Sequence, residues 1–518
     1  MERDIISDYE QTWDSFAVQM KNKKLVIFGT GIAGSVFFMR YPDISIALVI
    51  DNSKKKQGHY LRDFLFGYAN QDSGNQEIKS FDEIKGLGAD ECIVLVTAWA
   101  SYSDMMRQLR ENGFYCCFSL KLMETDNPTI TGETVQGYPR YLKEMYSARC
   151  REMELNPRKL VVTDMGHYSG HGKAITEQLL KIRRDIEIVW VLDDLSADTP
   201  KEVRKVWTES LQYHEEMASA GYWLIGSNIW LTDIKRPGQT YIHMKHWASV
   251  TLKTFGFDFY EFRGIESGLE VTRHDCESID YLIVGSRFDE DTCRRGYHYD
   301  GPVFYAGSPR SDILFEPDKY KDKICRQYKI EDTRKLLLYA PTFRGGTGKE
   351  YIYDSCSVIP DFTKIKKILE QGGDEWVVLL RLHPIVAQKS QGIPRDDFVI
   401  DVSAYEDSEE LVAACDMLIS DYSSIMFEPA FVHKPVFLYA PDKAEYINHE
   451  RRLLIDYDTL PFDIAENDEE LCRMMYGFRQ QEYDNRLDAF FEKHGVHEDG
   501  HAGERAANYI SELMKGDG

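Results

Sequence analysis

The sequence predicts an α/β protein built from parallel sheets in three consecutive blocks. Short apolar stretches recur along the chain, and segments with helical periodicity separate them. Repeated strand-helix units of this kind form parallel sheets that helices cover on both faces. The blocks begin at the strands KLVIFG (residues 24–29), LVVTDM (160–165) and YLIVGS (281–286). A stretch rich in Thr, Gly and Pro at 124–139 predicts a linker between the first two blocks.

Composition excludes several classes of function. The 518 residues carry a net charge of -24, so a nucleic-acid partner is not expected, because its phosphates require clustered Lys and Arg. No apolar run is long enough to span a bilayer, and the acidic N-terminus does not resemble a signal peptide. The 10 cysteines are scattered without a CxxC pair, which predicts reduced thiols and no structural zinc. We therefore expect a cytoplasmic protein.

The first block opens like a dinucleotide-binding fold. Its strand turns into a helix through Gly29, Gly31 and Gly34, and Asp51 ends the next strand. These residues are the candidate accessory nucleotide site. The unit closes near residue 122, which is too short for a complete dehydrogenase. A nucleotide- or sugar-nucleotide-binding accessory domain over 1–123 and a degenerate domain with a structural role are both open, with a linker and helix over 124–156.

The second block predicts a Rossmann-like layer with helices over 173–183 and 202–217. Its first strand and helix are joined by GHYSGHGKA at 166–174. Glycine-rich loops at the carboxyl ends of parallel strands often bind ligands, although a solvated loop is an equally good interpretation.

The strand TYIHMKHW at 240–247 ends beside a histidine that titrates near neutral pH. His246 is a candidate general base, although a single histidine is more often simply polar. His243 and His246 do not share a face of a strand, so we expect no metal site there. We predict no metal-binding residues in this chain.

In the third block, several strands end in polar loops that should meet at one edge of a parallel sheet. Arginine binds phosphate oxygens bidentately, and serines at a helix start add hydroxyl and backbone donors. The helix is expected over 425–431. The sequence therefore predicts a diphosphate cradle, formed by Arg310, Thr342, Arg344, His383, Ser423 and Ser424.

The motifs of this region resemble those of the CDP-glycerol glycerophosphotransferases, which build teichoic acids and related capsule polymers. The resemblance extends over roughly residues 155 to 470. It rests on GSPRSD (307–312), YAPTFR (339–344), RLHP (381–384) and SDYSSIMFEPAFVHKPVFLYAPD (420–442). The first 120 residues or so lie outside it and look like small Rossmann domains appended to many sugar-modifying enzymes.

The resemblance implies a GT-B architecture with a cleft between an acceptor lobe at 157–315 and a CDP-donor lobe at 316–518. It implies no cofactor and no obligatory metal. His246 and His383 are the implied catalytic residues. The implied donor-binding residues are Arg310, Thr342, Arg344, Asp421, Ser423, Ser424 and Glu428, the last by analogy with ribose-binding glutamates. One departure stands out, because the family usually reads Trp-His where this chain reads His246 and then Trp247.

The leading functional hypothesis is a transferase that moves glycerol or ribitol phosphate from a CDP-activated donor to a hydroxyl of a cell-surface polymer or its primer, releasing CMP. The acceptor is a polyol phosphate or a glycan, with a lipid-linked form left open. A GT-B glycosyltransferase that uses a CMP- or UDP-sugar is the first alternative, and a non-catalytic nucleotide-sensing protein is the second.

Contact with the inner face of the cell membrane is open, because the acidic chain shows no cationic amphipathic helix. The terminal helix, 504–515, is instead a candidate to pack back across the cleft between the lobes.

Overall fold

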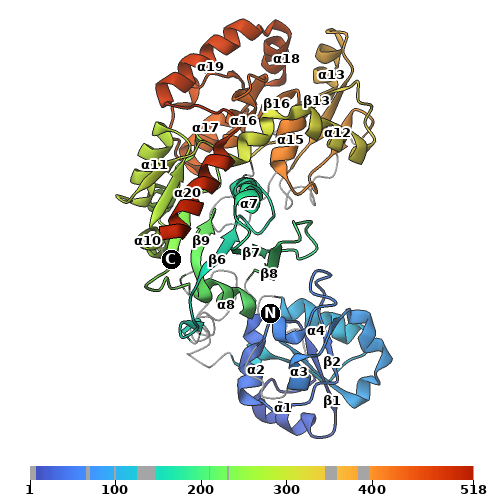
Figure 1. Cartoon of the computed structure of the whole chain (residues 1–518). Helices are drawn as coiled ribbons and strands as arrows, with labels where there is room; N and C mark the ends of the chain where they lie inside the picture. The colour runs from blue at the N-terminus through green and yellow to red at the C-terminus, as the bar shows by residue number, and fades with distance from the viewer. Residues whose placement is uncertain are drawn as a thin grey trace.

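The computed structural model describes residues 8–65, 71–98, 101–124, 147–148, 150–208, 210–229, 231, 233–342, 344, 359–382 and 396–516. Within these residues the strands form three parallel sheets, which follow one another along the molecule (Figure 1). The predicted class is confirmed: two Rossmann-like lobes form the larger part, and a small domain of the same kind precedes them. The linker predicted at 124–139 lies, apart from Glu124, outside the described residues.

The N-terminal domain has the strand order β3-β2-β1-β4-β5, with all pairs parallel. The central strand β1 is buried after its first residue, which explains its apolar sequence. The strands are β1 Lys24–Phe28, β2 Leu48–Ile50, β3 Ile78–Lys79, β4 Cys92–Val96 and β5 Cys117–Ser119. The α-helices are α1 Trp13–Met20, α2 Ser35–Arg40, α3 Gln71–Gly74, α4 Tyr102–Glu111 and α5 Leu120–Met123.

The first lobe has the strand order β12-β11-β10-β9-β6-β7-β8, again fully parallel. Its strands are β6 Asn156–Thr163, β7 Glu187–Leu192, β8 Val203–Trp207, β9 Ala220–Ile225, β10 Thr240–His243, β11 Tyr281–Val284 and β12 Val303–Tyr305. Its helices are α7 Gly170–Ile182, α8 Leu211–Ser219, α9 Gly256–Arg263, α10 Glu266–Ser278 and α11 Arg287–Tyr297.

The prediction of a helix over 202–217 is wrong. The structure has the edge strand β8 and then the shorter helix α8. Val203 and Val206 are the buried residues of β8, and their spacing of three suggests a helix in the sequence. Pairing of β8 along the whole length of β7 overrides that pattern, because strand propensity depends on the neighbours available.

The second lobe has the order β15-β14-β13-β16-β17-β18, with every pair parallel. Its strands are β13 Lys335–Tyr339, β14 Trp376–Leu380, β15 Val399–Asp401, β16 Met417–Ser420, β17 Val436–Tyr439 and β18 Asp463–Ala465. Its helices are α12 Pro317–Tyr328, α13 Phe362–Glu370, α15 Ser408–Ala414, α16 Phe427–Ala430, α17 Lys443–Glu445, α18 Asp468–Gly477 and α19 Gln480–His494. The helix expected over 425–431 is a 3-10 turn, η6 Ser424–Met426, followed by α16.

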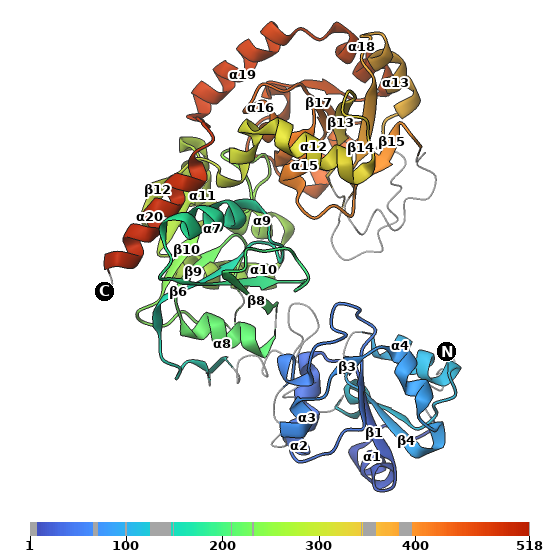
Figure 2. The same cartoon turned by 45° about the vertical axis from the view of Figure 1, so that its right-hand side comes forward.

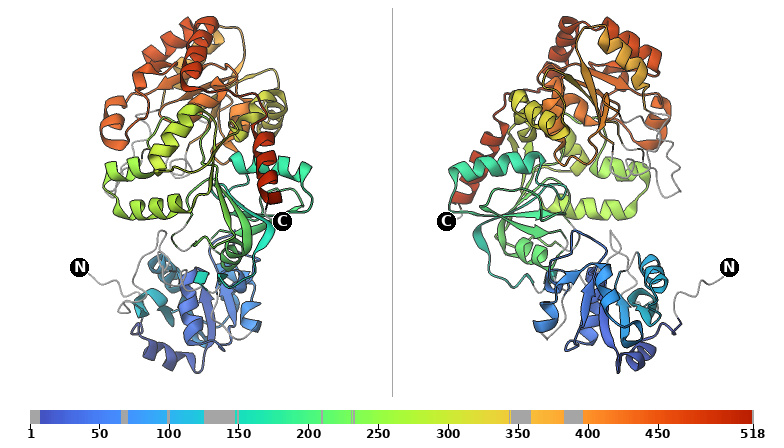
Figure 3. Two further views of the ribbon diagram at one scale, coloured as in Figure 1. Left: turned by 60° about the vertical axis from the view of Figure 1, so that its left-hand side comes forward. Right: turned by 90° about the vertical axis from the view of Figure 1, so that its right-hand side faces the viewer.

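The last helix returns to the first lobe. The chain enters the second lobe through the 3-10 segment η5 Pro309–Phe315, and α20 Ala502–Gly516 packs against α7 (Figures 1 and 3). Three residues of α20, Ala506, Ala507 and Ile510, belong to the same buried cluster as residues from the strands of the first lobe. The idea that the terminal helix packs back is confirmed, although its residues lie within the range 316–518 predicted for the second lobe.

The N-terminal domain contacts the first lobe at β8 and the loop after β7 (Figure 2). The Trp207 ring at the end of β8 lies 5.7 Å from the His59 ring and 5.6 Å from the Phe64 ring. Lys55 Nζ lies 3.5 Å from a carboxylate oxygen of Asp194. No α-helix in the described chain is long and apolar enough to cross a bilayer.

Candidate active site

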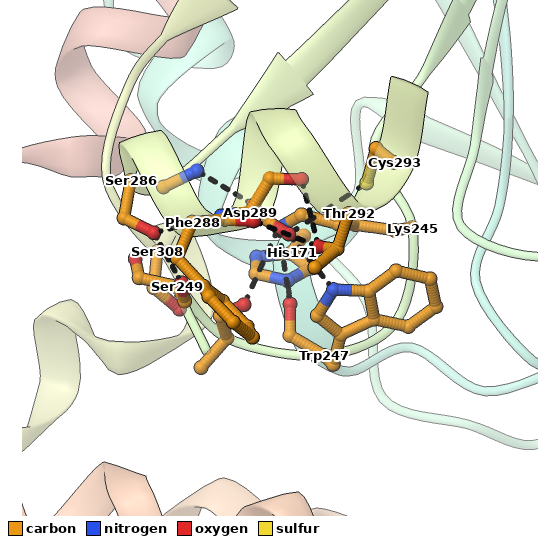
Figure 4. Close-up of polar contacts among 12 residues, drawn as sticks. His171, Lys245, Trp247, Ser249, Ser286, Phe288, Asp289, Thr292, Cys293 and Ser308 are labelled. Atoms are coloured by element: carbon orange, nitrogen blue, oxygen red, sulfur yellow. Dashed lines mark hydrogen bonds and ion pairs between the residues drawn. The ribbon is translucent and has the colours of Figure 1, made fainter. Parts of the chain in front are cut away.

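His246 stands between Lys245 and Trp247, whose side chains converge on the buried Asp289 (Figure 4). Asp289 accepts a hydrogen bond from Trp247 Nε1 at 2.9 Å and forms an ion pair of 2.9 Å with Lys245 Nζ. Both flanking side chains are therefore drawn into the interior. The side chain of His246, between them, is left exposed.

The backbone of this turn explains how the exchanged order of His and Trp is accommodated. Strand β10 ends at His243, earlier than the sequence indicated, and Lys245 has a φ of 52°. A lysine in the left-handed region is strained, and its buried ion pair with Asp289 is what holds it there. The exchange therefore falls in a turn, where no strand register has to be kept.

His171, from the glycine-rich loop of the second block, supports this turn from below. Its Nδ1 accepts a hydrogen bond from the Arg310 backbone N–H at 3.3 Å, so its Nε2 donates to the Trp247 carbonyl at 2.8 Å. Burial, and then the positive charge of Lys245, hold the pKa of His171 well below its ordinary value. This histidine is a neutral spacer that ties the backbone directly after His246 to the backbone of Arg310.

The His246 imidazole is itself neutral at pH 7. Desolvation by the protein around it, and then the positive charge of Arg310, lower the pKa of His246 to about 4. Solvent still reaches the ring. A neutral, accessible imidazole can accept a proton from a hydroxyl.

Arg310 joins the lobes beside this histidine. Its Nη1 donates to the His246 carbonyl at 2.7 Å, and its Nη2 pairs with the Glu428 carboxylate of α16. Glu428 is almost fully buried, and burial raises its pKa. Arg310 Nε and Glu428 Oε2 are both buried without a hydrogen-bond partner in the described chain. Unpartnered buried polar atoms are rare, so they mark this junction as a functional region.

Arg344 is placed differently from the sequence prediction. Its Nε donates to Asp442 at 2.7 Å, and its Nη1 donates to Asp421 at 2.6 Å and to the Thr342 carbonyl at 2.7 Å. Asp421 also accepts from the Thr342 backbone N–H at 2.8 Å. The structure thus brings Thr342, Arg344 and Asp421 together. The charges of Arg344 and Asp421, however, are paired with each other inside the second lobe. Thr342 Oγ1 has no partner among the described residues.

The two serines of the third block face different neighbours. Ser423 Oγ caps its own 3-10 turn by accepting from the Ile425 N–H at 3.4 Å. Ser424 Oγ lies 2.9 Å from Thr251 Oγ1 and accepts from the Leu252 N–H at 3.2 Å. Ser424 therefore contacts the first lobe directly, whereas the sequence had assigned both serines to one edge of the third block.

Two further cations complete this junction. Lys253 makes no ion pair with a described residue, and burial, followed by the positive charge of Arg451, lowers its pKa to about 8. Arg451 donates to the Thr254 carbonyl at 3.0 Å and lies over the Phe259 ring. The charges of Lys253 and Arg451 both act on His246. Neither residue was among the predicted site residues. Lys253 comes six residues after Trp247, so the His-Trp motif could have pointed to it, whereas Arg451 stands in no recognised motif.

His383 lies outside the described residues.

In the N-terminal domain, Gly29 has a φ of 96°, as its tight turn requires. Asp51 accepts hydrogen bonds from the Thr30 backbone at 2.9 Å and the Thr30 hydroxyl at 2.7 Å. This carboxylate therefore braces the loop that contains Gly31 and Gly34. In the described part of the chain, no group of three or more His, Cys, Asp or Glu side chains is arranged to hold a metal ion.

Two Rossmann-like lobes with a neutral imidazole and cations at their junction define the class, a GT-B transferase. The family described as CDP-glycerol:poly(glycerophosphate) glycerophosphotransferase matches residues 145–512. The chain belongs to this family, as its motifs suggested, and the N-terminal domain lies outside the match.

Curated relatives act on teichoic acids. The chain is 26% identical over 394 residues to the teichoic acid poly(glycerol phosphate) polymerase of Staphylococcus epidermidis, and the match covers 72% of this chain and 53% of that protein. It is 25% identical over 372 residues to the polymerase of the same name from Bacillus spizizenii, covering 69% of this chain and 93% of the relative. The chain therefore spans about half of one relative and nearly all of the other.

The solved structures of the wall teichoic acid polymerase TagF share this architecture. One of them matches with a TM-score of 0.64 and 26% identity, covering 73% of this chain and 94% of the solved chain. Another, a variant soaked with CDPG, matches with a TM-score of 0.63 and 25% identity, covering 72% of this chain and 94% of that one.

Proposed function

We propose that this protein transfers glycerol phosphate or ribitol phosphate from a CDP-activated donor to a hydroxyl of a cell-surface polymer or its primer. The family, the teichoic acid relatives and the likeness to TagF soaked with CDPG support this donor class. The observation that carries the proposal is the neutral, exposed His246 with the cations Arg310, Lys253 and Arg451 acting on it.

The acceptor hydroxyl attacks the β-phosphorus of the donor, and His246 takes the hydroxyl proton. The bond from the β-phosphorus to the oxygen shared with the α-phosphate breaks, and CMP leaves with that oxygen. Lys253 and Arg451 neutralise the charge that develops, because fixed cations need no reorganisation during the reaction. These cations take the part that a metal ion plays in other phosphoryl transfers, so activity should survive EDTA.

The donor-binding roles of Ser423, Ser424, Thr342 and Glu428, and a catalytic role of His383, are carried over from the family resemblance. Donor binding is best supported for Thr342 and Ser423. The Thr342 hydroxyl has no hydrogen-bond partner in the described chain, and the Ser423 hydroxyl makes only a long hydrogen bond. We place the reaction in the cytoplasm, the compartment in which the scattered cysteines are expected to stay reduced. A lipid-linked acceptor at the inner face of the membrane is part of the proposal.

The test is release of CMP from CDP-glycerol or CDP-ribitol in the presence of a polyol-phosphate or glycan acceptor. His246→Asn should lower the rate of release about 10²- to 10⁴-fold, whereas His501→Asn, at an exposed histidine that lies 3.6 Å from Glu504, should leave it unchanged. The proposal is wrong if the purified protein releases no CMP from either donor with any such acceptor. Products from a panel that includes CMP- and UDP-sugars, identified by mass, separate this function from a glycosyltransferase.

A further inference from the structure

A cavity of about 520 Å³ lies in the first lobe, at the carboxyl ends of its central strands. The ends of β6, β7, β8 and β9 form one side, and α10 forms another. A volume of a few hundred Å³ is typical of a site for one small-molecule unit. Of the segments singled out in the sequence, only the glycine-rich loop at 166–174 reaches this cavity, through Gly166.

The cavity is lined by polar side chains that are not otherwise engaged. Within the described chain these side chains form no hydrogen bond or ion pair with another residue: Thr163, Asp193, Ser227, Asn228 and Ser267. They come from separate segments, at β6, after β7, after β9 and on α10. Polar groups that converge without partners are available to hydrogen-bond a ligand.

The charges of the lining exclude an anionic ligand. The cavity has no lysine or arginine in its lining, and its one ionisable acid is the exposed Asp193. A phosphate there would meet a carboxylate and no cation, which is unfavourable. The remaining wall is apolar and aromatic, with Tyr260 and Val271. A lining that combines hydroxyl, amide and carboxylate groups with an aromatic residue suits a neutral, hydroxyl-rich ring.

The backbone beside the cavity leads to the proposed base. A hydrogen bond links the His246 ring with the backbone of Gly226, which directly precedes Ser227 and Asn228. Gly226 also donates its N–H to the Thr163 carbonyl at 2.9 Å. A ligand seated on Thr163, Ser227 and Asn228 therefore lies beside the residue that contacts His246.

We propose that this cavity binds a neutral sugar unit of the acceptor, next to the hydroxyl that His246 deprotonates. The inference rests on the proposed function, and it narrows the acceptor to one that presents an uncharged sugar near the attacking hydroxyl. The polyol-phosphate groups of the substrate then belong to the cationic junction, and the cavity discriminates between acceptors.

The first experiment measures binding without catalysis. Methyl hexopyranosides of glucose, galactose and mannose are titrated into the full chain and followed by saturation-transfer NMR, with glycerol 1-phosphate as the anionic probe. At least one hexoside should bind, and Asn228→Ala should weaken it about tenfold, the loss expected for one hydrogen bond of about 1.4 kcal/mol. Asn485→Ala, an exposed asparagine on α19, is the matched control and should change nothing.

The second experiment measures transfer. For a hexoside-terminated acceptor, Asn228→Ala should raise the KM of the acceptor about tenfold and leave the KM of the CDP-polyol donor within about twofold. The inference is overturned if no hexoside binds, if Asn228→Ala leaves hexoside binding unchanged, or if glycerol 1-phosphate binds in this cavity instead. Those results leave CMP release from the donor intact, whereas loss of CMP release in the wild type with every acceptor would refute the proposed function itself.

Discussion

Arg344 and Arg310 each stand in a buried cluster of carboxylates, but only the cluster around Arg344 is complete. Arg344 bonds Asp421 and Asp442 within the second lobe, and both acids have further donors. Arg310 reaches from η5 to Glu428 of α16, and both partners keep a buried atom without a hydrogen bond. A saturated cluster stabilises one lobe, whereas an unsaturated one between lobes has capacity left for a substrate.

The comparison assigns stability to one arginine and function to the other, although both stand in motifs of the same family. Arg344 also lies over the rings of Tyr422 and Tyr446, at 4.8 and 5.1 Å from their centroids, which buries it further. Arg310 instead donates to the carbonyl of His246. Variants of the two clusters should therefore separate folding from catalysis.

The largest effect is expected at the functional cluster itself. His246→Asn should lower kcat/KM by about 10²- to 10⁴-fold, the usual contribution of a general base, with no change in the urea midpoint. Because the pKa of His246 is lowered to about 4, protonation removes the base only in acid, and activity should fall below about pH 5. Retention of most of the activity in His246→Asn would remove the catalytic role from this cluster.

Breaking the complete cluster should mainly reduce stability. Arg344→Gln leaves two carboxylates uncompensated and should lower the free energy of unfolding by about 3–5 kcal/mol in urea titrations. Arg310→Gln should lower it by less, because Glu428, whose pKa burial already raises, can take up a proton. The exposed Arg326→Gln is the control, with a change within about 0.5 kcal/mol. Equal losses for Arg344→Gln and Arg310→Gln would contradict the distinction.

Lys253 tests whether the junction binds the anionic donor. Its pKa of about 8 means that its charge is lost as pH rises above 8, so the KM of the CDP-polyol should increase there. Lys253→Met should raise this KM about ten- to a hundredfold at pH 7 and remove the dependence on pH near 8. Lys366→Met, on the exposed face of α13, should behave as wild type.

Unfolding would not mimic this effect. Between about pH 8 and 10.5 the unfolded chain keeps a proton on Lys253 that the folded chain has lost, so this group makes the fold more stable as pH rises. A rise in KM without loss of structure is therefore diagnostic. A KM that is flat across pH 8 in the wild type would exclude Lys253 from donor binding.

The sequence predicted those parts of the molecule that depend on local residue patterns. Buried parallel strands are apolar throughout, and the polar loops after them must meet at one sheet edge, so the three sheets and their motif loops could be placed. Edge strand β8 was mistaken for helix because its two buried valines are three residues apart, and only pairing with β7 decides between the two.

The site depended more on tertiary contacts. Arg344 is paired with Asp442, which lies 98 residues further along the chain. Nothing in the sequence around either residue indicates this pairing. Arg451 reaches the junction from a loop without a motif. For the cavity of the first lobe, the sequence pointed only to the glycine-rich loop that begins at Gly166, because the rest of the lining comes from separate strand ends with ordinary Thr, Ser and Asn residues.

The smallest effect distinguishes the two adjacent serines at the junction. Ser424→Ala removes the contact with Thr251 and leaves the Leu252 N–H without its acceptor, so it should lower the free energy of unfolding by about 1–3 kcal/mol. Ser423→Ala loses only a long capping bond and should leave stability within about 0.5 kcal/mol while raising the KM of the donor. Urea titrations and donor kinetics on both variants are the measurement. If Ser424→Ala changes donor KM alone and Ser423→Ala changes stability, the serines have exchanged roles, and the donor phosphates would lie against Ser424, between the lobes.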